Sequence, residues 1–254
     1  RYWRWIPKPV LQGFEAMSGR LDRRRACARR LAKLASGISL EGDERLVRYF
    51  EWAETSELYQ LYSRALLSEI EGEGAGEPIL AYLSSLPPGL SDLERMLAVD
   101  QRFFLADHNL IYTDKMSMAA GVEVRVPFLD CDFVEFAAKI PDRFKQRGWT
   151  GKWALKKALE PILPKEVVYR PNTGFGAPLR KWMRNEFREL LDDVLSHESI
   201  NRRGLFNPET VERLRRNNDN GRIDGAYLLL GLVCVELWCR TFLDKSSEGS
   251  IYSE

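Results

Sequence analysis

An acid and a guanidinium separated by one residue are the clearest candidates for chemistry in this sequence. Glu123 and Arg125 alternate with three valines across residues 122–126. In an extended segment this period of two places the valines on one face and both charges on the other. The valine face suits a protein core, and Pro127 ends the segment because it cannot donate a ladder hydrogen bond. Since charges held near a core are costly unless paired or used, the segment is a candidate site.

The residues alone leave the roles of these side chains open. Glu123 and Arg125 could form a structural ion pair that ties the extended segment to a neighbouring helix, or they could act on a ligand. Asp114 could be a first-turn acid favoured by the helix dipole, which is the simpler interpretation, or a ligand contact. Ser117 could serve in packing or in a minor polar contact.

A lysine further along the chain is the second candidate. Thr150 precedes a predicted helix with Lys152 in its first turn, and prolines from Pro161 onward end this helix. The helix dipole disfavours a cation in the first turn unless an anion is also present. With a phosphate bound, the lysine and the free backbone N–H groups would act together. The alternative is an exposed lysine on a lysine-rich helix, as Lys156 and Lys157 suggest.

The elements that must position these residues are predominantly helical. Apolar residues recur at helical spacing, and the sequence has almost no strand pattern. Glycine and proline stretches at 72–78 and 87–89 predict breaks. The helices predicted before the charged segment are Leu21–Leu34, Leu46–Trp52, Leu58–Ile70 and Leu93–Leu105. The predicted helix Tyr227–Phe242 is apolar nearly all round and should be buried.

Local signals set the expected boundaries around the charged segment. Thr113 is the predicted N-cap of a short helix over Asp114–Ala120, and Gly121 is its predicted terminator. Asp132 is the predicted cap of the following helix. The apolar stripe of that helix, which we expect to lie in the core, comprises Phe133, Phe136, Ala137 and Ile140.

Composition narrows the class of protein. The chain has 254 residues, of which 44% are hydrophobic and 30% charged, and its formal net charge is +1. This is a soluble globular profile without a field that would attract nucleic acid or membrane. The longest apolar run, Tyr227–Val235, is too short to span a bilayer, and no signal peptide is recognisable. Because the sequence begins without Met, we expect it to be a piece of a longer protein.

Cysteine and histidine usage predicts no metal site. The four cysteines are scattered without a CxxC pair, which favours free thiols in a reducing cytoplasm. The two histidines are too few for histidine-rich metal sites and argue against His-based triads. These six residues are Cys27, Cys131, Cys234, Cys239, His108 and His197.

Three ordered motifs carry a resemblance to a known family. Residues 114–130 read DKMSMAAGVEVRVPFLD and resemble the signature DRxSMAxGLExRxPFLD of the asparagine synthetase family. The later runs GKWAL at 151–155 and RPNTGFGAPLRKW at 170–182 match that family in the same order. The aromatic run at 2–5 also resembles the segment that follows the family's nucleotide-binding half. The resemblance is strong from residue 93 to 182 and loose elsewhere.

The resemblance implies a fold and an activity. It implies a mainly α chain, the multi-helix C-terminal half of an α/β adenine-nucleotide α-hydrolase-like (PP-loop) synthetase domain whose nucleotide-binding sheet is largely missing. Residues 1–254 would then divide into a helical part at 1–92, a motif-bearing core at 93–185, C-terminal helices at 186–245 and a tail at 246–254. The family uses ATP and Mg²⁺, adenylates a carboxylate, usually that of aspartate, and releases AMP when ammonia attacks. The ammonia comes from glutamine through a glutaminase domain of the same parent chain. The scattered cysteines and the small net charge separately predict a cytoplasmic protein without nucleic-acid or membrane partners.

The resemblance also assigns roles. It implies that Lys152 contacts ATP and stabilises the adenylation transition state, because negative charge develops at the α-phosphate. Glu123 would be catalytic, positioning Lys152 or the attacking amine. Arg125 would bind the substrate carboxylate in a bidentate contact, with Asp114 and Ser117 as further substrate contacts. Two positions depart from the family pattern, Lys115 in place of arginine and Asn172 in place of lysine.

Other functions remain open at this point. The isolated chain should be inactive, because the Ser-Gly-Gly-x-Asp-Ser loop that grips ATP is absent from it. Relatives with the same motifs close β-lactams or amidate peptides and sugar acids, so the acceptor could differ. A non-catalytic helical interaction or RNA-binding module, using the basic run at 20–30, is an alternative of another class.

Overall fold

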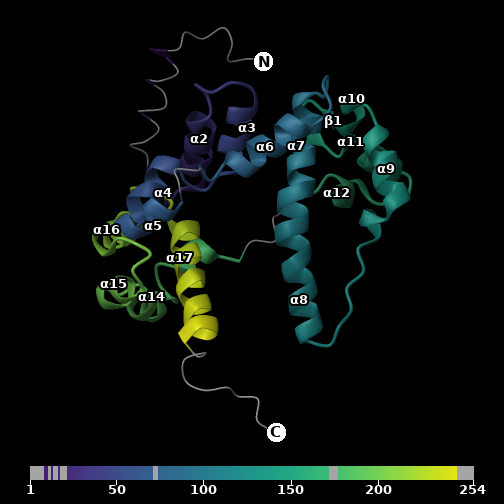
Figure 1. Cartoon of the computed structure of the whole chain (residues 1–254). Coiled ribbons are helices and arrows are strands. Elements are labelled where there is room, and N and C mark those ends of the chain that lie inside the picture. The colour runs from purple at the N-terminus through teal and green to yellow at the C-terminus, as the bar shows by residue number, and fades with distance from the viewer. Residues whose placement is uncertain are drawn as a thin grey trace. The chain divides into compact units, whose positions relative to one another are not determined.

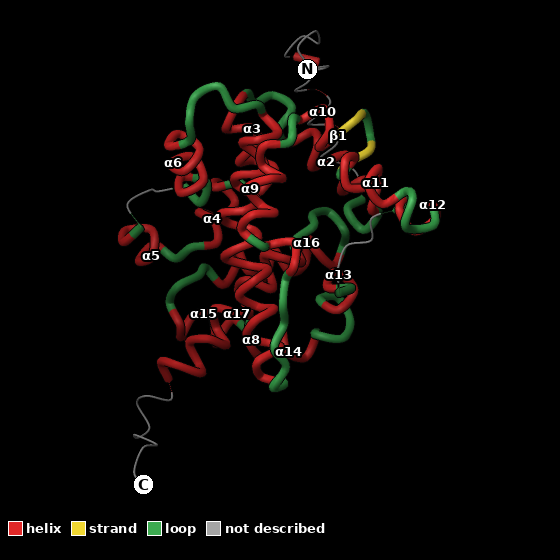
Figure 2. The backbone as a smooth tube through the Cα atoms, turned by 90° about the vertical axis from the view of Figure 1, so that its right-hand side faces the viewer, coloured by secondary structure: helices red, strands yellow, loops and turns green. Residues whose placement is uncertain are grey.

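The chain is mainly helical, as predicted, and divides into two compact units. The computed structural model describes residues 9, 10, 13, 17, 22–70, 74–171 and 177–244. The first unit comprises Arg1–Ala81 and Gly176–Glu254, and the second comprises Tyr82–Phe175. Helix accounts for most of the described backbone in Figure 2, and the strands form one small hairpin.

The first unit contains helices from both ends of the chain. From the N-terminal side these are α2 (Ala26–Ser36), α3 (Gly42–Phe50), α4 (Thr55–Leu61) and α5 (Arg64–Glu69), and α6 (Glu77–Ser85) leads into the second unit. From the C-terminal side they are α13 (Leu179–Trp182), α14 (Arg188–Val194), α15 (His197–Arg203), α16 (Pro208–Asp219), α17 (Ala226–Cys239) and the π-helical η4 (Arg240–Asp244).

The core of the first unit surrounds α17, which Figure 1 shows in yellow. Leu229, Leu232 and Val233 of this helix are buried together with side chains from α14, α15 and α16. The prediction of a buried helix is therefore confirmed along this face. Ala226–Asp244 is long and apolar enough to cross a membrane by length and composition alone. Of its most apolar window, 33% lies buried inside the structure.

A buried acid fixes the C-terminal part of α17. Glu236 is only 3% exposed and accepts hydrogen bonds from Arg203 Nε at 2.8 Å and Arg240 Nε at 2.9 Å. Ser199 Oγ donates to the same carboxylate at 3.2 Å. The charge is thus paired and hydrogen-bonded, which is the condition for tolerating an ionised group inside a core.

One predicted helix is two helices. The stretch predicted as Leu58–Ile70 breaks between α4 and α5, and Ser63 caps α5 by accepting a hydrogen bond from the N–H of Leu66. At the break, Ser63 N donates to Leu205 O at 2.9 Å and Asn207 N donates to Leu61 O at 2.8 Å. Backbone pairing with residues 205–207 therefore replaces the helical hydrogen bonds that continuation would have made.

The second unit is built along one long helix, which Figure 1 shows in teal. The helices α7 (Asp92–Val99), the π-helical η2 (Asp100–Leu110) and α8 (Ile111–Ala119) follow one another without a break. Thr113 therefore lies inside the helix and is not the predicted N-cap. The remaining elements are η3 (Pro127–Leu129), α9 (Cys131–Lys139), α10 (Asp142–Lys145), β1 (Gln146–Arg147), β2 (Thr150–Gly151), α11 (Trp153–Leu159) and α12 (Lys165–Val168).

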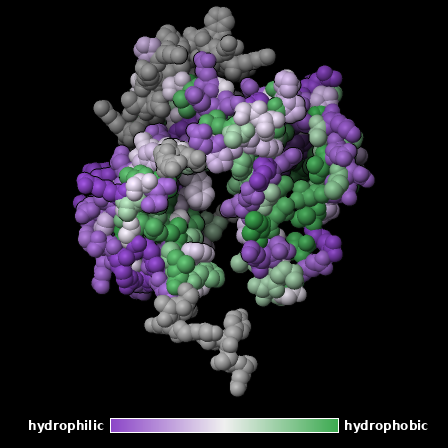
Figure 3. Space-filling model, in the orientation of Figure 1, coloured by the Kyte–Doolittle hydropathy of each residue, from purple (hydrophilic) through white to green (hydrophobic). Residues whose placement is uncertain are grey.

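Few apolar side chains are buried in the second unit. Among its described residues only Leu83, Val99 and Val168 are buried hydrophobics. The predicted core face of the 122–126 segment is instead exposed, with its valines between 44% and 56% accessible. The α9 stripe is also not in a core, since Phe133 and Phe136 are exposed. In Figure 3, hydrophobic residues reach the surface over this part of the chain.

Candidate functional site

A glycine turn places the charged segment beside α8. Gly121, with φ +68°, follows the helix, and its N–H donates to Met118 O at 2.9 Å. The N–H of Val122 reaches back to Ser117 O at 2.9 Å, which completes a Schellman motif. The predicted terminator is therefore confirmed. Because φ in this region favours glycine, the residue type fixes where the chain reverses.

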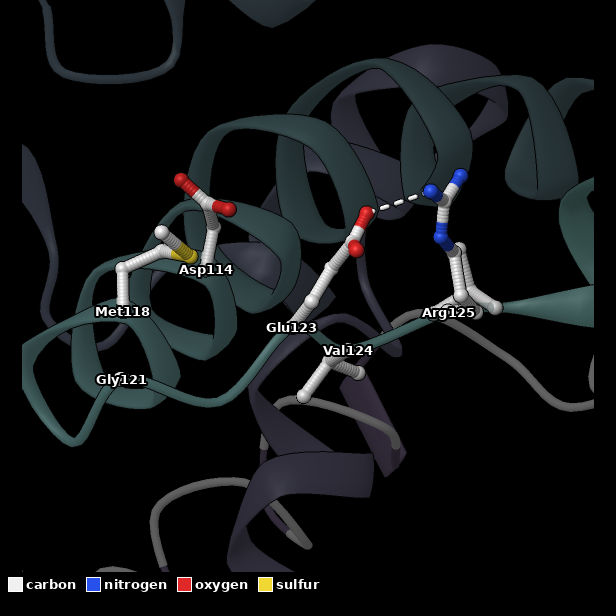
Figure 4. A pocket seen from close by; sticks show the side chains of 7 residues that line it. Asp114, Met118, Gly121, Glu123, Val124 and Arg125 are labelled. Carbon is white, nitrogen blue, oxygen red and sulfur yellow. Dashed lines mark ion pairs between the residues drawn. The ribbon is translucent and has the colours of Figure 1, made fainter.

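The turn and the segment enclose an open pocket of about 490 Å³. Figure 4 shows the side chains of Asp114 on α8 and of Glu123 and Arg125 on the segment extending from the same side of the backbone. Two carboxylates and one guanidinium thus surround a space large enough for a small polar molecule. The lining residues are Asp114, Met118, Gly121, Glu123, Val124, Arg125 and Val126.

The two charges predicted to share a face form an ion pair with each other. Arg125 Nη2 lies 2.5 Å from Glu123 Oε1, and the side chains are 83% and 66% exposed. The expectation of buried charges is wrong, and the pair does not tie the segment to a helix. Exposed pairs contribute only about 0–1 kcal/mol to stability. Both groups are therefore accessible to a ligand at little structural cost.

Asp114 and Ser117 have different environments. Asp114 lines the pocket, whereas Ser117 does not. The Ser117 hydroxyl donates to the backbone carbonyl of Asp114 at 3.0 Å, as serines inside helices commonly do. Since α8 continues directly from η2, Asp114 does not sit at a free helix N-terminus. The dipole interpretation of this acid therefore loses its basis.

Lys152 has the most unusual backbone in the described part of the chain. Its φ of +56° and ψ of +35° lie in the left-handed region, and no other described non-glycine residue has a positive φ. Lys152 is the N-cap of α11 and so precedes the first turn in which it was predicted. For a residue with a Cβ this conformation costs roughly 1–2 kcal/mol, and such strain is concentrated at functional sites.

The structure brings only some of the predicted site residues together. Asp114, Glu123 and Arg125 share the pocket, but Lys152 does not line it. The sequence missed Met118 and Val124 as lining residues. Met118 falls one turn after Asp114, so helical periodicity could have found it.

In the ranges that the structure describes, no three His, Cys, Asp or Glu side chains are grouped as a metal site would require. The cap of α9 is Asp130, whose carboxylate accepts a hydrogen bond from Phe133 N at 3.1 Å, and not Asp132 as predicted. Asn172 and the aromatic run at 2–5 lie outside the described residues.

A family model described as asparagine synthase matches residues 1–240. Asparagine synthetase [glutamine-hydrolyzing] 1 of Bacillus subtilis is 40% identical over 155 residues, which are 61% of this chain and 24% of that protein. A putative asparagine synthetase [glutamine-hydrolyzing] of Mycobacterium tuberculosis (strain H37Rv) is 33% identical over 159 residues, 62% of this chain and 24% of its own length. The matched region thus spans about a quarter of these curated relatives. No solved structure matches the chain.

Proposed function

The chain belongs to the asparagine synthase family, and we propose that it forms the C-terminal helical part of an ATP-dependent, AMP-forming amide synthetase. The substrate we propose is aspartate, which would be converted to asparagine with ammonia released from glutamine. The printed names of the relatives, glutamine-hydrolysing asparagine synthetases, support this assignment. We place the enzyme in the cytoplasm, in line with its free cysteines.

The observation that carries the proposal is the charge pattern of the pocket. Aspartate presents carboxylates and one ammonium, and the pocket presents one guanidinium and two carboxylates. Arg125 would bind a substrate carboxylate through a bidentate contact, for which its planar fork is suited. Asp114 would face the substrate ammonium. Ser117 would act only indirectly, since its hydroxyl is bonded to the backbone of Asp114.

Glu123 would act on the incoming nitrogen. When ammonia attacks an acyl adenylate, the nitrogen gains a positive charge and must lose a proton. The Glu123 carboxylate is exposed and lies in the same pocket as Arg125. Once a substrate carboxylate engages Arg125, the Glu123 carboxylate would be available to position the amine or accept its proton.

Lys152 would serve the nucleotide. Adenylation builds charge at the α-phosphate and releases pyrophosphate, so a fixed cation lowers the barrier. Lys152 is exposed and held in a strained backbone, and its side chain makes no capping hydrogen bond to α11. These features fit an ammonium kept available for an anion. ATP with its Mg²⁺ would be held mainly by a PP-loop part of the synthetase that these 254 residues do not contain.

The PP-loop part of the synthetase would pack on the exposed apolar face of the second unit. The valines of segment 122–126 and the aromatic stripe of α9 are patterned for a core yet lie at the surface. Exposed apolar surface that is patterned for a core marks an interaction site. The relatives are about four times as long as the matched region, which leaves ample chain to cover it. A nucleotide-binding sheet packed there would complete the site.

An acceptor screen tests the function. The full-length synthetase is assayed for pyrophosphate release with MgATP, ammonia and one carboxylate at a time. We expect release to depend on aspartate and to yield asparagine. Equal turnover without aspartate would transfer the assignment to another amide-forming acceptor, such as a β-lactam precursor, a peptide or a sugar acid. Residues 1–254 alone should make no asparagine under the same conditions.

A further inference from the structure

The strained backbone of Lys152 requires surrounding structure to hold it, and two neighbouring elements supply that structure. Before the lysine, β1 and β2 pair in antiparallel register, with Arg147 opposite Thr150. After it, Lys156 N donates to Lys152 O at 3.0 Å and starts α11. A left-handed residue persists only where its surroundings over-determine it.

The hairpin on the N-terminal side is closed by a two-residue loop. Gly148 and Trp149 connect the strands, and Gly148 has φ +57°. Glycine accepts this conformation without a steric penalty, so the loop imposes no strain of its own. The strain is thus confined to the junction between the hairpin and α11.

The side chain of Trp153 crosses this junction. The Trp153 ring, directly after Lys152, lies 5.7 Å from the Phe144 ring of α10. The guanidinium carbon of Arg147, in β1, lies 5.3 Å from the centroid of the same Trp153 ring. Aromatic pairs and cation–π contacts of this kind each contribute about 0.5–1.5 kcal/mol, which is comparable with the cost of one left-handed residue.

We propose that Trp153 is a positioning residue for Lys152. Its ring, through its contacts with Phe144 and Arg147, fixes the first turn of α11 against α10 and the hairpin. The backbone between the hairpin and the helix then closes through the left-handed conformation of Lys152. This conformation gives the Lys152 side chain its direction. The inference rests on the proposed contact of Lys152 with the phosphates of ATP.

The test compares four variants of the full-length synthetase. Trp153→Ala removes the ring, and Trp153→Phe keeps an aromatic face for Phe144 and Arg147. Trp149→Ala is the matched control, because Trp149 is a fully exposed tryptophan at the tip of the same hairpin. Lys152→Met removes the cation. For each variant we measure kcat and the KM values for MgATP and aspartate.

Trp153→Ala should lower kcat/KM for MgATP by up to about 100-fold, the loss expected when a contact group is misplaced by about 1 Å. The aspartate KM should stay within about twofold of its original value, Trp153→Phe should restore kcat/KM for MgATP, and Trp149→Ala should not change it. A loss of activity in Trp153→Ala that is matched by an equal loss of folded protein in circular dichroism would overturn the proposal. An unchanged kcat/KM for MgATP in Trp153→Ala, together with a lowered one in Lys152→Met, would also overturn it.

An error in the proposed function can be distinguished from an error in the role of Trp153 through Lys152→Met. If Lys152→Met leaves kcat/KM for MgATP unchanged, the assignment of Lys152 to ATP is wrong, whatever the result for Trp153→Ala. The positioning of Lys152 by Trp153 is then judged on residues 1–254 by NMR, from backbone chemical shifts that report φ at Lys152. A left-handed Lys152 in the unaltered chain and in Trp153→Phe, but not in Trp153→Ala, supports it. The same φ in all three overturns it.

Discussion

At the scale of single residues, Lys152 is where local conformation departs most from expectation. Nothing in the run GKWAL specifies a positive φ, because lysine has no preference for the left-handed region. The sequence placed this lysine near the start of a helix, but its conformation depends on contacts with Phe144 and Arg147 made through Trp153. Such contacts join separate elements and cannot be deduced from the spacing of the residues.

The strain at Lys152 gives a stability prediction. Glycine relieves a left-handed conformation and alanine does not, so Lys152→Gly should be more stable than Lys152→Ala by about 1 kcal/mol. Urea denaturation of residues 1–254 measures the difference. Lys156→Gly, within α11, is the control and should be less stable than Lys156→Ala by about 1 kcal/mol. Equal stability of the two Lys152 variants would show that this residue is not strained.

The partly buried Lys33 should make the stability of the chain depend on pH. Burial, with repulsion from Arg48 as a smaller cause, lowers the pKa of Lys33 from 10.5 to about 8. Its ammonium donates to the carbonyl oxygens of Arg48, at 2.9 Å, and Glu51. Between pH 8 and 10.5 the unfolded chain therefore binds more protons at this site than the folded one. The Lys33 contribution to the unfolding free energy should rise with pH across this window.

A variant that lacks Lys33 isolates the contribution of this lysine to the unfolding free energy. Unfolding free energies are measured from pH 7.5 to 10.5 for the original chain and for Lys33→Met. Subtracting the two curves removes the titration of groups common to both proteins. The unfolding free energy of the original chain should increase relative to that of Lys33→Met as the pH rises. A difference that is constant over the window would contradict the lowered pKa.

At the scale of elements, the features that were predictable are those set by a residue's own conformational preference. Gly121 ends α8 as expected, because its left-handed backbone is a local requirement. The separation of α4 from α5 was missed, because Leu61 and Ser63 pair with residues 205–207, far away in the sequence. Glu123 and Arg125 do share a face, as their alternation predicted. The expected burial of the valines was wrong, since all three are exposed.

The buried carboxylate of Glu236 anchors α17 to α15. Burial alone would raise the pKa of Glu236, but hydrogen bonds from Arg203 and Arg240 hold it below its ordinary value. Glu236→Gln would leave both guanidinium groups without their shared carboxylate, and breaking a buried pair in this way costs about 3–5 kcal/mol. Thermal or urea unfolding measures the loss. Glu212→Gln, in the exposed pair with Arg216, is the control and should lose less than about 1 kcal/mol.

At the scale of the whole molecule, the two units differ in how much apolar surface they bury. The first unit has a continuous cluster of buried residues around α17. The described part of the second unit has only three buried apolar side chains. This contrast follows if the second unit depends on further synthetase chain for its core. Composition could not reveal it, because both units contain apolar residues in helical patterns.

Hydrogen exchange should reveal the same contrast. Local opening requires less free energy where few apolar contacts are broken. In residues 1–254 alone, we expect the amides of α9, α11 and α12 to exchange faster than those of α17. In the full-length synthetase, α9 and segment 122–126 should become protected while α17 changes little. Equal protection of α9 in both proteins would mean that no additional chain packs on this face.

The most direct test of the central claim, that the pocket beside α8 holds the carboxylate acceptor, is the aspartate KM of Arg125→Gln in the full-length synthetase. Arg102→Gln is the control, since Arg102 forms another exposed ion pair in the second unit, 2.9 Å from Asp107. Loss of a hydrogen bond between charged groups costs about 1.5–3 kcal/mol, so Arg125→Gln should raise the aspartate KM by about tenfold or more. The MgATP KM should stay the same, and Arg102→Gln should change neither value. An aspartate KM that Arg125→Gln leaves unchanged would contradict the assignment of this pocket.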